Sequence, residues 1–68
     1  MTIEIELNGK PRAIAPHTSV ADLVRELGVR PEIVAVEVNQ RLVARDRRDA
    51  YLLAAGDRVE LVTLVGGG

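Results

Sequence analysis

The segment "TIEIELNGKPRAIA", residues 2–15, carries the clearest structural signals at the start of the chain. Polar and apolar residues alternate through its first half, which predicts a strand with one buried face. The dipeptide Asn8-Gly9 in the middle is the strongest short signal for a hairpin turn. The second half is the returning strand, and Pro11 cannot donate a hydrogen bond to a neighbouring strand. We therefore expect a β-hairpin whose second strand lies at a sheet edge or bends there.

A short amphipathic helix is predicted to follow the hairpin. Ser19 is the expected N-cap, and Asp22 lies three residues later, near the positive end of the helix. Gly28 favours a left-handed stop, and Pro31 prevents the helix from resuming. One apolar stripe is formed by Val20, Leu23, Val24 and Leu27.

The rest of the chain predicts three more strands. Their expected ranges are 33–38, 41–43 and 58–65. Asn39 and Gln40 form the turn between the first two of them, and Gly56 with Asp57 forms the turn before the last. Val59 and Leu61 share one face of the last strand.

The polar segment 45–51, "RDRRDAY", separates the short strand from the last one. It predicts irregular chain or one helical turn, with Asp46 as the cap. The arginines of this segment alternate with aspartates, so we expect a solvated loop. Tyr51 is expected to place its ring at the rim of the core and its hydroxyl in water.

This order of elements predicts an α+β fold. The apolar stripe of one helix needs one apolar sheet face to cover. The economical solution is a mixed sheet of four to five strands with the helix across one face. The first and last strands then lie side by side and parallel in the centre, which is the ubiquitin-like β-grasp arrangement. Residues 1–68 are expected to form a single domain, with 65–68 as a flexible tail.

Composition narrows the function classes. The 68 residues carry nine basic and ten acidic side chains, so a nucleic-acid partner is not expected. The absence of Cys excludes a thiolate metal site and fits a reducing compartment, and no signal peptide or membrane-length apolar run is visible. His17, the single His, has no evident nucleophile beside it. We expect a cytoplasmic protein with no metal site and no membrane partner.

The chain resembles the ThiS family of ubiquitin-like sulfur carriers over its whole length. The resemblance is densest in "EIELNG", "VEVNQRLVAR" and "AAGDRVELVTLVGGG". In the middle segment Ala44 stands where the family pattern V-N…V-P-R has Pro. The residues that match that pattern are Val38, Asn39, Val43 and Arg45. The residues that match the family's closing segment are Gly56, Asp57, Glu60 to Val62, Gly67 and Gly68.

The resemblance implies a protein co-substrate that is not itself an enzyme. A ThiF-like adenylyltransferase would use ATP and Mg to adenylate the carboxylate of Gly68. A persulfide on a sulfur donor protein would then give a thiocarboxylate, and a ThiG-like thiazole synthase would take the sulfur. The carrier would bind no cofactor of its own.

The residue types at the end of the chain suit that role. A terminal carboxyl is ionised at neutral pH and must be activated before a nucleophile can attack it. Glycines lack a Cβ, so Gly66 and Gly67 would let the backbone thread into a narrow channel of a partner. Docking would fall to Val62 and Leu64, which are expected to face away from the helix, and to Arg45.

Three other functions remain open at this point. A MoaD-like subunit of molybdopterin synthesis would use the same tail chemistry for another client. A ubiquitin-like modifier would also form an acyl-adenylate but would end on lysines. A plain β-grasp binding module would leave the glycines without a role.

Overall fold

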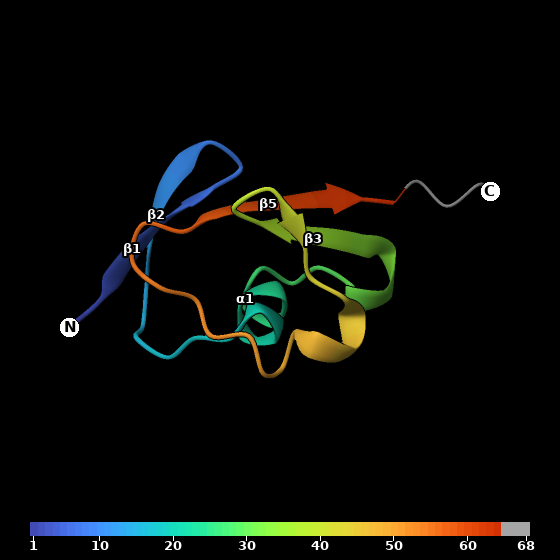
Figure 1. Ribbon diagram of the computed structural model, residues 1–68, viewed down its shortest axis with the longest axis horizontal. Helices are drawn as coiled ribbons and strands as arrows, with labels where there is room; N and C mark the ends of the chain where they lie inside the picture. The colour runs from blue at the N-terminus through green and yellow to red at the C-terminus, as the bar shows by residue number, and fades with distance from the viewer. Residues whose placement is uncertain (65–68) are drawn as a thin grey trace.

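The computed structural model describes residues 1–64 and contains a five-stranded mixed sheet with one α-helix against one face (Figure 1). The order of the strands is β2-β1-β5-β3-β4. The elements are β1 (Ile3–Leu7), β2 (Lys10–Ile14), α1 (Val20–Glu26), the 3-10 turn η1 (Pro31–Ile33), β3 (Val34–Val38), β4 (Arg41–Leu42), the 3-10 turn η2 (Arg45–Arg47) and β5 (Arg58–Thr63). This is the α+β, β-grasp arrangement that the sequence predicts.

The N-terminal hairpin forms as predicted. Strands β1 and β2 pair antiparallel, with Leu7 opposite Lys10 at the turn. Asn8 and Gly9 have φ angles of 49° and 84°, so both central residues are left-handed, as a type I′ turn requires. β2 is an edge strand, and Pro11 therefore removes no hydrogen bond from the interior of the sheet.

β5 is the central strand of the sheet (Figure 1). It runs parallel to β1, with Leu7 opposite Val59, and antiparallel to β3, with Val34 opposite Thr63 at the far end. The prediction that the first and last strands are central, adjacent and parallel is confirmed. Thr63, the last residue of β5, therefore lies in the middle of the sheet.

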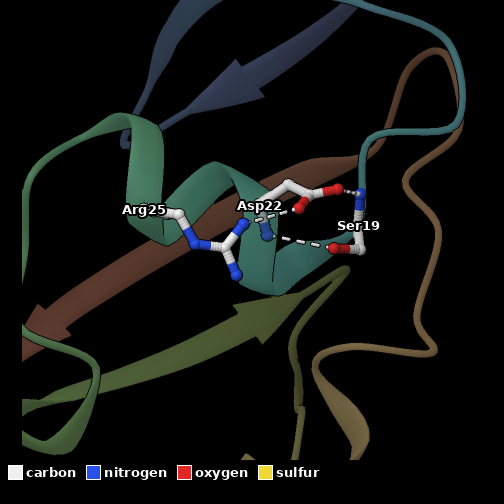
Figure 2. Close-up of polar contacts among 3 residues, drawn as sticks. All are labelled: Ser19, Asp22 and Arg25. Carbon is white, nitrogen blue, oxygen red and sulfur yellow. Dashed lines mark hydrogen bonds and ion pairs between the residues drawn. The ribbon is translucent and has the colours of Figure 1, made fainter.

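A capping box starts α1, as Figure 2 shows. The Ser19 hydroxyl accepts a hydrogen bond from the backbone N–H of Asp22 at 3.0 Å, and the Asp22 carboxylate accepts one from the backbone N–H of Ser19 at 3.1 Å. Arg25 donates to the other oxygen of Asp22 at 2.9 Å. The two bonds with Ser19, and then Arg25, hold the pKa of Asp22 below its ordinary value.

The core consists of aliphatic side chains between α1 and the inner face of the sheet. The predicted helix stripe is buried at Val20, Leu23 and Val24, and Leu27 packs against it at the C-cap. The remaining buried residues are Ile5, Ile14, Val34, Val36, Val38, Val43, Leu53 and Val59. Tyr51 lies at the boundary, 37% exposed.

The strand limits differ slightly from the prediction. Pro31 occupies the first turn of η1, where its fixed φ is favourable, so Ile33 belongs to η1 and β3 begins at Val34. β4 ends at Leu42, because Val43 turns into the core. β5 ends at Thr63, and the predicted continuation to 65 and the tail 65–68 lie outside the described residues.

The polar segment corrects two predictions. Asp46 is not a cap: the N-cap of η2 is Ala44, with no capping side chain, and Asp46 lies within the turn. Arg48 is not solvated: its side chain is folded inward, and the residue is only 5% exposed. Among residues 1–64, no helix has the length and apolar character needed to cross a membrane.

Candidate docking surface

Asn39 fixes the start of β5. Its side-chain carbonyl accepts from the Arg58 N–H at 2.9 Å, and its side-chain amide donates to Asp57 at 3.0 Å. The other Asp57 oxygen accepts from the Ala54 N–H at 2.8 Å, which confirms that Asp57 shapes this turn. Sequence reasoning gave Asn39 only a turn role, although its place in the family pattern was a signal for more.

Asn8 fixes the middle of β5 from the opposite side. β1 ends at Leu7, and the Asn8 side-chain carbonyl accepts from the Leu61 N–H at 2.9 Å, just beyond the end of β1. The Asn8 backbone N–H also donates to the Val59 carbonyl at 2.9 Å. Two turn asparagines, one from each neighbouring strand pair, thus position the strand that leads to the chain end.

Backbone hydrogen bonding of the β5 segment continues beyond β3 to η1, up to the last described residue. Leu64 donates its N–H to the Ile33 carbonyl at 2.6 Å. Beneath this point the guanidinium of Arg48 donates to the carbonyls of Pro31 and Val34, at 3.0 and 2.6 Å. Arg48 therefore supports the segment against which the end of β5 pairs.

An apolar patch lies next to this point on the sheet face opposite α1. Val62 and Leu64 are 54% and 52% exposed, while Val59, with the opposite orientation, is buried. This confirms the predicted facing of these side chains. Ala35 stands opposite Val62 in β3 and lies on the same face. We call Ala35, Val62 and Leu64 the outer patch.

Carboxylates border the outer patch along the same face. Glu60 of β5 stands directly opposite Glu37 of β3. Glu6 of β1 forms an ion pair with Arg58, with 3.5 Å between the carboxylate oxygen and the guanidinium nitrogen. A hollow of about 190 Å³ lies beside these groups, lined by Glu6, Gly9, Gln40, Arg58 and Glu60.

Arg45 lies elsewhere. It is exposed and lines a cavity of about 380 Å³ on the helix side, together with Val24 and Arg25 of α1 and with Arg48. Burial, and then the positive charge of Arg45, lower the pKa of Arg48. The structure therefore brings Val62 and Leu64 together but does not place Arg45 within the outer patch.

The outer patch and the carboxylates beside it are suited to contact with a partner. His17 lies in a turn and has a φ of 68°. Within residues 1–64, no group of three or more His, Cys, Asp or Glu could hold a metal ion. The predicted acyl site Gly68 and the threading residues Gly66 and Gly67 lie outside the described residues.

Comparison with known proteins gives a family match that reaches the end of the chain. A model of the ThiS family matches residues 5–68. A thiamine biosynthesis protein, ThiS, from Geobacter metallireducens is 35% identical, with a TM-score of 0.85 over 97% of this chain and 100% of the other. A ubiquitin from Caldiarchaeum subterraneum, at 23% identity and a TM-score of 0.54, shares the fold.

Curated relatives give a second link. A thiazole synthase from Magnetococcus marinus is 39% identical over 66 residues, 97% of this chain and 20% of the relative. The chain thus spans about a fifth of that synthase, and it covers 93% of the uncharacterized protein ycf40 of Porphyra purpurea at 32% identity. With the family match over 64 consecutive residues (5–68) and the agreement in fold, the chain belongs to the ThiS family.

Proposed function

We propose that this protein is the sulfur carrier of thiamine (thiazole) biosynthesis and that the carboxylate of Gly68 carries the sulfur. The observation that carries the proposal is the family match, which continues through Gly68. It is supported by the position of β5, which is the central strand of the sheet and carries exposed apolar side chains near its C-terminal end. In this role the protein is a co-substrate, acted on by partner enzymes.

The chemistry has three steps. A carboxylate oxygen of Gly68 attacks the α-phosphate of ATP on a ThiF-like adenylyltransferase, and pyrophosphate leaves. The terminal sulfur of a donor persulfide then displaces AMP, and a thiol reduces the resulting acyl disulfide to the thiocarboxylate. ATP and Mg belong to the activating enzyme, and the reaction takes place in the cytoplasm.

Docking relies on the outer patch. Among residues 1–64, Val62 and Leu64 are the large apolar side chains nearest to the chain end in sequence, and both are about half exposed. Burying them against a partner would supply part of the free energy needed to order Gly66 and Gly67 in its channel. Arg45, on the helix side, would contact an acidic group of the partner at a separate point.

A ThiG-like thiazole synthase is the proposed recipient of the sulfur. Segments similar to this chain make up about a fifth of the length of two proteins named thiazole synthase. A carrier segment within the synthase chain would hold the sulfur donor close to the enzyme that uses it. We extend this pairing to the present chain, with a ThiG-like synthase as its partner.

The test is the mass of the C-terminal tryptic peptide 59–68, which excludes Met1 and its oxidation. The protein is isolated from its own cells, and again after incubation with ATP, Mg, a persulfide donor, a thiol and the ThiF-like enzyme. Replacement of one oxygen by sulfur on Gly68 supports the carrier. The control is a chain lacking Gly67 and Gly68, which should stay unmodified.

Other results would point to the alternatives. An unmodified peptide under both conditions would refute the carrier. Isopeptide-linked adducts on cellular lysines would indicate a ubiquitin-like modifier. Sulfur transfer to a molybdopterin precursor, with none to thiazole formation, would indicate a MoaD-like subunit.

A further inference from the structure

Two glutamates of like charge lie side by side on the outer face of the sheet. Glu37 and Glu60 are directly opposite each other in the antiparallel pair β3–β5. Like charges in this position destabilise a sheet. Among residues 1–64, neither carboxylate forms an ion pair. The free protein therefore has two carboxylates without an ionic partner on facing positions of the sheet, two residue pairs from Ala35 and Val62 of the outer patch.

The hollow on the same face adds a third carboxylate. It is lined by Glu6 and Glu60, and Arg58 is the one cationic side chain among its described lining residues. Arg58 is already paired with Glu6. Of the three carboxylates, Glu6, Glu37 and Glu60, only Glu6 has an ionic partner among residues 1–64. A second cationic group placed here would find acceptors that have no counter-charge in the free protein.

We propose that the activating enzyme carries an Arg or Lys that docks at Glu60, between Glu37 and the hollow, while its apolar residues cover the outer patch. This inference rests on the proposed function, because it specifies the partner surface that receives the carrier. Apolar contact provides affinity, and the ion pairs fix orientation and speed the encounter.

The negative charge beside the outer patch favours a partner with a basic surface over a second copy of this chain. A two-fold contact between copies places the same patch on both sides. Glu37 and Glu60 of one copy would then approach the same glutamates of the other, and the repulsion would grow. A basic partner surface relieves it.

The test is the rate of thiocarboxylate formation by the ThiF-like enzyme with ATP, Mg, the persulfide donor and a thiol. Glu60→Gln should lower kcat/KM for the carrier roughly threefold to fivefold, the upper part of the range of an exposed ion pair. Glu60→Arg should lower it on the order of tenfold or more, since like charges then meet across the interface. The unfolding midpoint of Glu60→Gln should equal or exceed that of the wild type.

Salt dependence and a matched control complete the design. Wild-type kcat/KM should fall as ionic strength rises, and that of Glu60→Gln should fall less. Glu26→Gln, at an exposed position of α1 away from the outer patch, changes net charge equally and should keep wild-type rates. Glu37→Gln removes the facing carboxylate on β3, and we expect it to lower kcat/KM and its salt dependence as Glu60→Gln does.

The outcomes separate the two proposals. If the wild type acquires no thiocarboxylate, both the proposed function and this inference fall. If the wild type is modified, but Glu60→Gln and Glu37→Gln match it in rate and salt dependence, the inference alone is overturned. An equal loss in Glu26→Gln would also overturn it, because the effect would then reflect net charge.

Discussion

Replacing Arg48 by Met tests how the end of β5 is supported. The Arg48 guanidinium is buried and donates to the carbonyls of Pro31 and Val34. Val34 is the β3 residue opposite Thr63, the last residue of β5. Met keeps an unbranched stem in the same space but can donate no hydrogen bond, so the variant removes the two donors with little change in packing.

The expected loss is about 2–4 kcal/mol of unfolding free energy. Each carbonyl left without its donor costs about 1–3 kcal/mol, and the sum is reduced because a charge no longer has to be buried. A chain of this length has a total stability of roughly 3–10 kcal/mol. The melting temperature of a small domain falls by about 4–8 °C per kcal/mol, so a drop of roughly 10–30 °C is expected.

Urea unfolding of Arg48→Met and Arg47→Met measures the effect. Arg47 is the exposed neighbour, and its replacement should change stability by no more than about 0.5 kcal/mol. If the two variants are equally stable, Arg48 contributes nothing through its buried bonds and the reasoning is refuted. Hydrogen exchange should also be faster at the Leu64 amide in Arg48→Met, because its acceptor, Ile33, adjoins Val34.

Three further substitutions test the clamp, the cap and the patch. Asn39→Ala removes two side-chain hydrogen bonds and places Ala at a left-handed φ of 53°, which Ala adopts less readily than Asn. Urea unfolding should show a loss of about 1–3 kcal/mol of unfolding free energy, and a smaller loss for Asn39→Gly, because Gly tolerates this φ. Asp22→Asn should be less stable than the wild type at neutral pH. Because the folded pKa of Asp22 is lowered, its contribution is complete above the ordinary value of 3.8 and is lost as pH falls through the folded pKa, so the two unfolding midpoints should converge in acid. Leu64→Ser should stay within about 0.5 kcal/mol of wild-type stability, while the mass assay should show thiocarboxylate formation slowed roughly tenfold.

The sequence predicts the elements whose signals are local. The Asn8-Gly9 turn follows from adjacent residues, and the Ser19 cap from residues three apart. The outward orientation of Val62 and Leu64 follows from simple alternation along one strand. These features need no knowledge of what packs against them.

Features that depend on distant partners could not be predicted. Arg48 reaches acceptors 17 and 14 residues away, so neither its burial nor its role is visible among the neighbouring arginines. The opposition of Glu37 and Glu60 depends on the register of β3 against β5, which the hydrophobic pattern of each strand does not fix on its own. Asp46 resembled a cap because its residue type is common there, but the turn begins two residues earlier.

The magnitudes explain how the fold can keep a repulsive pair beside its docking surface. An opposed like-charge pair costs a few tenths of a kcal/mol to about 1 kcal/mol. The side chains of Asn8 and Asn39 together make three hydrogen bonds that hold β5 or the turn before it, each worth about 0.5–1.5 kcal/mol. These bonds outweigh the repulsion, so β5 keeps its register with Glu37 and Glu60 face to face. A partner's cation can then remove a penalty that the free protein has already incurred, which favours the docked state over the free one.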